Sequence, residues 1–278
     1  MLNMQNMRIK MTNFHKKNIL ISGGSSGIGL ALAKKFSLFG SNVILLARDK
    51  EKLSSAAKSI SQLTLNPNQV ISTISADVRD FKSLESQINK NIKPIDVLIN
   101  SAGITYPGRF LDLDPQIYEN IILTNYMGTV NLTKLIAPGM ADRKSGTIVN
   151  ISSLAGLVGI FGYTAYAPSK YAIRGFSRCL RSELKPYGIN VYLVLPPDTD
   201  TPQLAFEREI MPETTKKINS SAGKMSPESV ADVIIKGIRK NKFRIIPGFE
   251  GKILALFSPI FEHFLYKFAV KQESKSIH

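Results

Sequence analysis

Apolar, β-branched runs alternate along the chain with longer segments in which apolar residues recur at helical spacing. The apolar runs are continuous, which is typical of strands buried on both faces of a parallel sheet. We expect six such strands, at residues 18–22, 42–46, 70–75, 96–100, 147–152 and 190–195. Because helices fill the gaps, the pattern predicts a doubly wound α/β fold of Rossmann type, with helices on both faces and the active site beyond the carboxyl ends of the strands.

The pattern changes after the sixth strand. Residues 203–224 have mixed polarity and no clean period, and we interpret them as a lid inserted into a single catalytic domain that spans residues 18–250. Regular structure resumes at Ser226-Pro227-Glu228, which is typical of a helix start, and residues 244–246 can form a last strand. Apolar lid residues either cover an alkyl chain of the substrate or pack on the domain itself: Leu204, Phe206, Ile210, Met211 and Ile218.

The two ends differ from the domain between them. Residues 1–17 are basic and contain no apolar run of signal-peptide length, so we interpret them as a loose leader. Residues 251–278 form a hydrophobic or amphipathic extension, in which Pro259, Glu262 and Lys267 argue against a clean membrane span. The apolar stretch 253–270 either lies peripherally in a membrane interface beside the basic residues of 236–244, or forms a dimer contact or a core helix.

Composition narrows the possible partners. The formal net charge of +15 favours anionic cofactors or lipid surfaces, but the charge is dispersed and forms no basic stripe with interleaved aromatic residues. We therefore expect no nucleic-acid partner. One cysteine and three widely separated histidines also argue against a disulfide scaffold and against a metal site.

The first predicted strand runs directly into a glycine-rich turn and a helix. Gly23, Gly27 and Gly29 allow the backbone to approach a pyrophosphate closely, and the helix start at Ser26 and Ile28 offers unpaired N–H groups to it. A strand, glycine turn and helix in this order predict a dinucleotide site.

The end of the second strand distinguishes NAD from NADP. The sequence there is Leu46-Ala47-Arg48-Asp49, so a small residue stands where an acid would bind the ribose hydroxyl, and Arg48 suits a 2′-phosphate. We therefore predict NADP(H). Ser25 and Lys52 either add contacts to this phosphate or are solvated surface residues.

Further cofactor contacts are expected at the ends of the third and fourth strands. Asp77 and Val78 can border the adenine, and a turn of small residues with Asn100, Ala102 and Gly103 gives the dinucleotide a surface to lie against.

Tyr166 and Lys170 are four positions apart, so on a helix they share one face. An ammonium beside a tyrosine stabilises the phenolate, which makes the phenol a better proton donor near neutral pH. Ser153, at the end of the fifth strand, can hydrogen-bond a substrate oxygen, and is favoured over Ser152. Asn125 is a polar residue in a helical stretch, and beside the other three it can hold a water that relays protons to Lys170.

Together these motifs resemble the short-chain dehydrogenase/reductase family over about residues 18–246. The resemblance implies a seven-stranded, mostly parallel sheet, a nicotinamide cofactor that also contacts Tyr166 and Lys170, a catalytic tetrad of Asn125, Ser153, Tyr166 and Lys170, and a homodimer or homotetramer. The usual Pro-Gly after the sixth strand is Pro196-Pro197 here, and the usual Asn-Asn-Ala-Gly is Asn-Ser-Ala-Gly. Pro196, Thr199 and Thr201 remain as expected cofactor contacts.

A narrower resemblance joins residues 161–166, 183–187 and 196–202 to the branch of this family that reduces 3-dehydrosphinganine with NADPH in sphingoid-base synthesis. It implies a hydrophobic, long-chain lipid ketone as substrate and a cytoplasmic protein, peripheral on the endoplasmic reticulum in a eukaryote. The alternatives are a reductase of another hydrophobic or acyl-linked ketone, such as a 3-oxoacyl thioester or a steroid, and a non-catalytic NADP-binding regulator.

Overall fold

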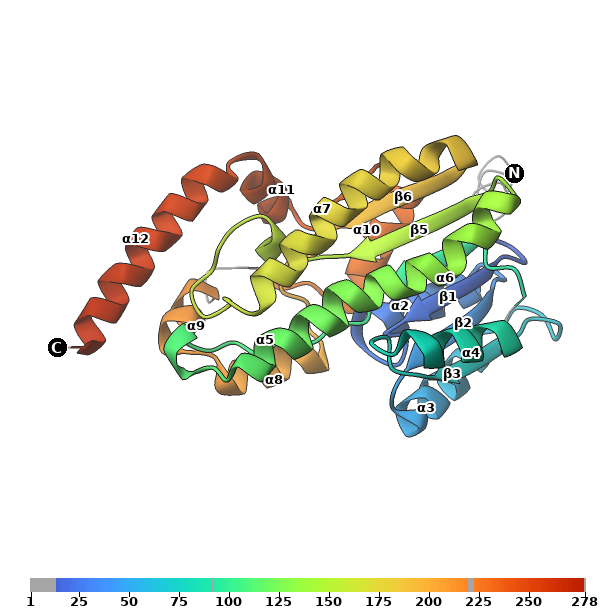
Figure 1. The fold of residues 1–278 in the computed structure, drawn as a ribbon, viewed down its shortest axis with the longest axis horizontal. Coiled ribbons are helices and arrows are strands. Elements are labelled where there is room, and N and C mark those ends of the chain that lie inside the picture. Colours follow the sequence, from blue (N-terminus) through green and yellow to red (C-terminus); the bar gives the residue numbers. More distant parts are fainter. Residues whose placement is uncertain (1–13, 92, 220–222, 278) are drawn as a thin grey trace, which may run out of the picture.

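The computed structural model describes residues 14–91, 93–219 and 223–277. Its centre is one parallel sheet with strand order β3-β2-β1-β4-β5-β6-β7 (Figure 1). The strands are β1 (Asn18–Ser22), β2 (Asn42–Ala47), β3 (Ile71–Ser75), β4 (Val97–Asn100), β5 (Gly146–Ile151), β6 (Ile189–Val194) and β7 (Arg244–Ile245). The order reverses between β1 and β4, which is where a doubly wound sheet opens a ligand crevice. The predicted fold class is confirmed.

Helices follow most of the strands. They are α2 (Gly27–Leu38), α3 (Lys50–Ser61), α4 (Phe81–Asn91), α5 (Pro115–Ile122), α6 (Gly128–Asp142), α7 (Tyr166–Leu184), α8 (Pro202–Ile210), α9 (Glu213–Asn219), α10 (Pro227–Arg239), α11 (Phe249–Leu256) and α12 (Ser258–Ile277). A short π-helical segment, Leu123–Met127, joins α5 to α6. In Figure 1, α12 extends away from the sheet as a long arm.

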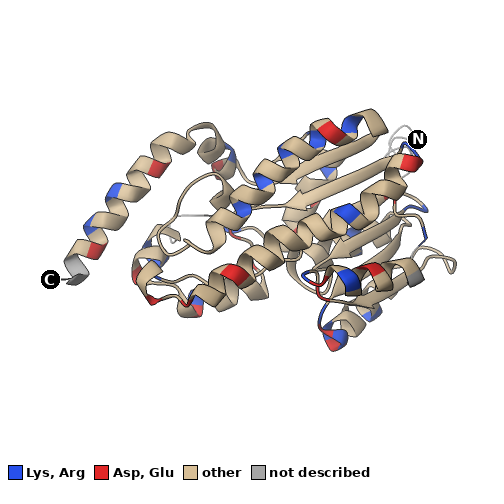
Figure 2. Ribbon diagram, viewed as in Figure 1, with Lys and Arg blue, Asp and Glu red and all other residues tan. Residues whose placement is uncertain are grey.

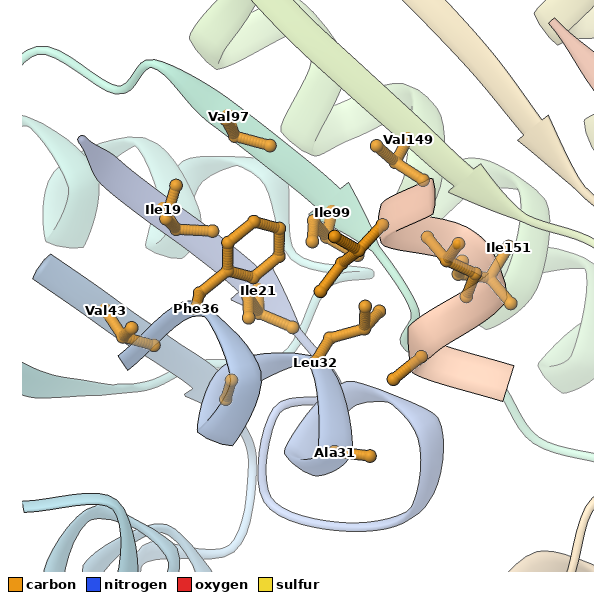
Figure 3. Close-up of a cluster of buried hydrophobic side chains, with 14 of the residues drawn as sticks. Ile19, Ile21, Ala31, Leu32, Phe36, Val43, Val97, Ile99, Val149 and Ile151 are labelled. Atoms are coloured by element: carbon orange, nitrogen blue, oxygen red, sulfur yellow. The ribbon is translucent and has the colours of Figure 1, made fainter. Parts of the chain in front are cut away.

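The core lies in two layers because successive strand residues point to opposite faces. Ile19 and Ile21 of β1 belong to the layer under α2, α3 and α10, which Figure 3 shows around Phe36. Leu20, between them, belongs to the layer under α4 and α6. Each fully buried side chain of this size stabilises the fold by about 2 kcal/mol. The packed sheet therefore fixes the strand ends on which the site is built.

The third predicted strand differs from the expectation of burial on both faces. Of the five residues of β3, only Ile74 is buried, and Thr73 is exposed. The physical reason is its position, because β3 is an edge strand that pairs only with β2.

The predicted lid, residues 203–224, is more regular than expected, because much of it is helical in α8 and α9. Thr201 caps α8 by accepting a hydrogen bond from the Leu204 N–H at 3.3 Å, and Pro202 occupies the first turn. A second helix, α9, follows at once. Residues 220–222 of the predicted lid lie outside the described residues.

The end of the predicted leader packs against the domain. Residues 1–13 lie outside the described residues, but Phe14 is buried with its ring 5.0 Å from that of Phe36. The guanidinium of Arg239 lies over the Phe39 ring at 4.5 Å in the same cluster. Arg239 thus stacks at the amino ends of the strands, whereas α11 follows the carboxyl end of β7. This part of the basic segment does not lie beside the C-terminal helices.

Candidate active site

The predicted glycine turn lies between β1 and α2. Gly23 and Gly27 have positive φ angles of 67° and 52°, and a Cβ on Gly29 would lie 2.3 Å from the Gly23 carbonyl oxygen. The Ser26 side chain forms no capping hydrogen bond, and the first turn of α2 contains no acidic residue. The helix N-terminus is therefore available to an anion, which fits the pyrophosphate of a dinucleotide. Ile28 lines the cleft beside this turn.

Asp49, the acidic residue after β2, caps the N-terminus of α3. Asp49 accepts hydrogen bonds from the N–H groups of Glu51 and Lys52 at 3.1 and 3.0 Å, and these bonds lower its pKa. The Lys52 ammonium lies 3.4 Å from the same carboxylate. Arg48 is exposed next to this pair, where it can meet a phosphate, and Ser25 of the glycine turn is half-buried.

Three other predicted cofactor residues, Asp77, Val78 and Asn100, do not line the cleft. The Arg79 guanidinium donates a hydrogen bond to the Asp77 carboxylate at 2.7 Å. Burial raises the pKa of Asp77, but Arg79 lowers it by more, so the pKa lies below its ordinary value. Val78 is buried in the core. The Asn100 amide donates to Thr133 Oγ1 at 3.1 Å and to Asn150 at 2.8 Å, inside the domain.

The segments after β4 and β6 complete the cofactor side of the cleft. The Ala102 N–H donates to Ser22 Oγ at 3.2 Å, which fixes the turn that leads to Gly103. Pro196, Thr199 and Thr201 line the cleft, and a Cβ on Gly27 would lie 3.0 Å from the Thr201 methyl carbon. The loop after β6 therefore faces the glycine turn across the cofactor site.

Tyr166 and Lys170 occupy the first turn and a half of α7, and both side chains are buried. The Lys170 ammonium lies 5.4 Å from the centroid of the Tyr166 ring and donates to the Ile151 carbonyl oxygen at 3.3 Å. Helical spacing thus brings the two side chains onto one face, as predicted.

The two serines at the end of β5 have different environments. Ser152 is buried, and its hydroxyl donates to the Lys170 carbonyl oxygen at 2.8 Å. Ser153 lies one residue further along, where its hydroxyl accepts from the Ala155 N–H at 3.1 Å and its hydrogen bond with the Tyr166 phenol lowers the pKa of that phenol. Ser153 is the serine that meets Tyr166.

Asn125 is fully buried in the π-helical segment, a form of helix that is frequent at functional sites. Its amide oxygen accepts from the Ile104 N–H at 2.8 Å, and its amide nitrogen donates to Ser169 Oγ at 2.9 Å. A Cβ built on Gly103 would lie 3.3 Å from the Asn125 amide oxygen and 3.4 Å from the Lys170 ammonium. Asn125 and Lys170 therefore converge on one point beneath Gly103.

Burial and nearby carboxylates shift the pKa values of Tyr166 and Lys170. Burial raises the pKa of Tyr166, and the carboxylates of Glu207 and Asp198 raise it further. The pKa of Lys170 is lowered to about 8, because burial lowers it by more than the Glu207 carboxylate raises it. The phenol therefore needs a nearby cation to act as a proton donor at neutral pH.

The cleft has a volume of about 640 Å³ and extends from the glycine turn past Ser153 and Tyr166 to the C-terminal helices. Its far part is apolar. The apolar side chains there are Leu154, Val158, Ile160, Leu204, Ile218, Ile253, Leu254, Phe261 and Leu265. The cleft can hold a dinucleotide at one end and an alkyl chain at the other.

Sequence reasoning missed Glu207, whose carboxylate lines this cleft although its residue is only 7% exposed. It accepts a hydrogen bond from the Tyr163 hydroxyl at 2.6 Å and another from the Gln203 amide at 3.2 Å. A signal was present, because Leu204, Glu207 and Met211 have helical spacing and are all buried. A glutamate in such an apolar stripe indicates a buried charge.

The contribution of α11 and α12 to the cleft was also missed. The Glu262 carboxylate accepts from the Gly159 N–H at 3.0 Å, and Glu273 pairs with Arg109 at 3.0 Å and accepts from Thr214 Oγ1 at 2.6 Å. These contacts join residues far apart in sequence, so no local pattern predicts them. Within the described part of the chain, no single helix is long and apolar enough to cross a membrane, whereas α11 and residues 258–274, bent by 95°, satisfy the length and composition requirements as a pair.

Known proteins are similar to this chain in fold and in sequence. The short chain dehydrogenase family model matches residues 17–211. The 3-dehydrosphinganine reductase of Danio rerio is 38% identical over 89% of this chain and 75% of its own length, and the 3-ketodihydrosphingosine reductase of Dictyostelium discoideum is 35% identical over 93% and 83%. Both resemblances predicted from the motifs are thereby confirmed.

A solved short-chain dehydrogenase from Sphingobium yanoikuyae, in complex with NADPH, is 26% identical, covers 89% of this chain with 95% of its own, and superimposes with a TM-score of 0.75. The family match, the relatives and the sheet order agree. The chain belongs to the short-chain dehydrogenase/reductase family of oxidoreductases.

Proposed function

We propose that the protein reduces 3-dehydrosphinganine, a long-chain 2-amino-3-ketone, to sphinganine with NADPH. The observation that carries the proposal is a cleft that runs from the glycine turn past Ser153 and Tyr166 to a group of apolar side chains. The relatives from Danio rerio and Dictyostelium discoideum, which carry the names of such reductases, support the substrate. The exposed Arg48 supports the choice of NADPH.

NADPH, when bound, supplies the hydride that adds to the carbonyl carbon. The Ser153 hydroxyl donates a hydrogen bond to the carbonyl oxygen and stabilises the negative charge that develops there. Tyr166 donates its phenolic proton to the same oxygen, which yields the secondary alcohol. The Lys170 ammonium, 5.4 Å from the Tyr166 ring, stabilises the phenolate that remains.

We assign Asn125 a positioning role beside Lys170. Its amide holds Ile104 and Ser169, so the floor of the site is fixed under Gly103. The remaining acceptor position on its amide oxygen suits a water that returns a proton to Lys170 and from there to Tyr166.

We also propose that α11 and α12 bring the cleft to a membrane surface. Large apolar side chains on them are exposed, among them Phe249 at 76%, Leu256 at 73% and Phe264 at 65%. Figure 2 shows acidic and basic residues spread along α12, where Lys267 and Lys271 lie with Glu262 and Glu273, and Lys252 lies on α11. Because Phe261 and Leu265 of α12 also line the cleft, an alkyl chain can enter along the same apolar side chains.

Flotation with anionic liposomes tests the membrane proposal on the full chain. Leu256→Glu with Phe264→Glu should abolish flotation, whereas Leu111→Glu, at an equally apolar residue that is 92% exposed elsewhere, should not. A mutated pair that floats like the wild type contradicts the proposal. A wild-type protein that stays with the dense fraction and sediments as a dimer, while the mutated pair is a monomer, shows that the face is a subunit contact.

The substrate is tested by following NADPH oxidation with 3-dehydrosphinganine, with an acetoacetyl thioester, and with NADH in place of NADPH. We expect turnover with the sphingoid ketone and NADPH. Turnover with the thioester alone would show that the protein is a reductase of an acyl-linked ketone instead. No turnover with any ketone, although NADPH binds, would favour the non-catalytic regulator.

A further inference from the structure

The substrate side of the cleft contains a carboxylate to which the mechanism assigns no task. Glu207 lies on the inner face of α8, and its carboxylate lines the same cleft as Ser153 and Tyr166. Tyr163, which donates a 2.6 Å hydrogen bond to it, has its ring centroid 5.7 Å from that of Tyr166. The carboxylate is thus one side chain away from the proton donor.

Glu207 is held by neutral groups. The Tyr163 hydroxyl and the Gln203 amide are its hydrogen-bond donors. In the described ranges of the chain, no lysine or arginine forms a salt bridge with it. Burial accordingly raises the pKa of Glu207, while the bonds from Tyr163 and Gln203 lower it. A buried carboxylate without a cation is costly, so a cationic ligand group would bind there strongly.

Two further acids line the cleft, Glu250, which accepts a hydrogen bond from the Gly223 N–H at 2.9 Å, and Asp198. Asp198 has a different environment from Glu207. Burial raises its pKa, but the positive charges of Arg208 and Lys224 act in the opposite direction. Its charge is therefore partly compensated by the protein, whereas that of Glu207 is not.

The Glu207 charge also opposes proton donation by Tyr166. Its negative field raises the pKa of Tyr166 and thus weakens that group as a proton donor. A ligand cation beside Glu207 would cancel this field at the moment when the phenolate forms. A neutral ketone brings no such cation.

We propose that Glu207 binds the 2-ammonium group of the substrate and selects amino ketones over neutral ketones. The inference rests on the proposed function and deepens it. In an α-amino ketone the nitrogen is two bonds from the carbonyl carbon, so a carbonyl oxygen on Ser153 and Tyr166 leaves the ammonium close to the same face of the cleft. Tyr163 and Gln203 orient the carboxylate toward it.

The test compares two ketones of equal chain length, 3-dehydrosphinganine and its deamino analogue, in three proteins. For the wild type, kcat/KM should be higher for the amino ketone. Glu207→Gln should lower the ratio of the two kcat/KM values by roughly tenfold or more, because it removes a charge-assisted hydrogen bond. Glu209→Gln, which changes an exposed carboxylate two residues away on α8, should keep the wild-type ratio.

Glu207→Asp keeps the charge and should restore part of the ratio, which a purely structural role would not require. Binding of sphinganine, measured by calorimetry, should weaken in Glu207→Gln and not in Glu209→Gln. If Glu207→Gln lowers kcat/KM for both ketones equally and binds sphinganine normally, the inference is overturned and the proposed function stands. If the wild type does not reduce 3-dehydrosphinganine at all, the proposed function fails, and the sphinganine titrations alone decide whether Glu207 binds an ammonium.

Discussion

The nucleotide half of the cleft and the substrate half are built from different kinds of contact. On the nucleotide side, Gly23, Gly27 and Gly29 lie within seven consecutive residues, in the turn after β1 and the start of α2. On the substrate side, α8 lines the cleft together with α11 and α12, which come much later in the sequence. A rigid, local motif can serve one cofactor, whereas a wall of separate helices can be reshaped to serve a particular ketone.

Tyr166 stands where the two halves meet, and its loss should have the largest effect. Tyr166→Phe removes the proton donor, so we expect kcat to fall by about 10²- to 10⁴-fold. Single-turnover kinetics with NADPH and 3-dehydrosphinganine give the value. NADPH binding should persist, because the variant keeps the ring and the Gly23 turn. Near-normal turnover would rule out the assigned role.

The nucleotide half should not tolerate even one added methyl group at its turn. In Gly29→Ala the new Cβ would lie 2.3 Å from the Gly23 carbonyl oxygen, so the turn must move. We expect NADPH affinity to fall by more than about tenfold and the free energy of unfolding by about 1–3 kcal/mol. Titration with NADPH and urea denaturation measure the two effects.

Gly175→Ala is the matched control, since a Cβ there meets nothing within 4 Å in the exposed middle of α7. It should stabilise the protein by about 0.5–1 kcal/mol. Equal effects of the two substitutions would contradict the proposed tightness of the glycine turn.

Cofactor choice should depend on Arg48 more than on its neighbour. Arg48→Ala should raise KM for NADPH by about 10- to 100-fold and leave KM for NADH nearly unchanged, because only NADPH carries the 2′-phosphate. Lys52→Ala should have a smaller effect, since Lys52 already pairs with Asp49. Initial rates with NADPH and with NADH measure both KM values. An unchanged preference for NADPH in Arg48→Ala would show that another residue recognises the 2′-phosphate.

The pH profile tests whether a charge on the substrate half reaches the catalytic lysine. With a pKa of about 8, Lys170 loses its proton as the pH rises through that value, and kcat/KM should fall on the alkaline side. Glu207 raises this pKa, so Glu207→Gln should move the alkaline fall to lower pH, by less than about one unit. Glu209→Gln serves as the control. An identical profile in Glu207→Gln would show that the two halves are not electrostatically coupled.

The sequence by itself determined the sheet, the glycine turn and the Tyr166–Lys170 pair. Each rests on short-range physics: alternating faces of a strand, the small side chains that a turn requires, or two residues four apart on a helix. Local patterns also indicated that Ser153 ends a strand and that Asn125 lies in a helical stretch. The structure places Ser153 beside Tyr166 and Asn125 beside Lys170, and their catalytic roles stay predictions.

Only the tertiary structure decided the rest of the site. The Asn100 amide turned inward to Thr133 and Asn150, because these partners lie on other elements. Glu207 joined Tyr163 across 44 positions of sequence, and Phe261 reached the cleft only through the path of α12. Contacts at such separation depend on how helices pack against the finished sheet, which no local period encodes.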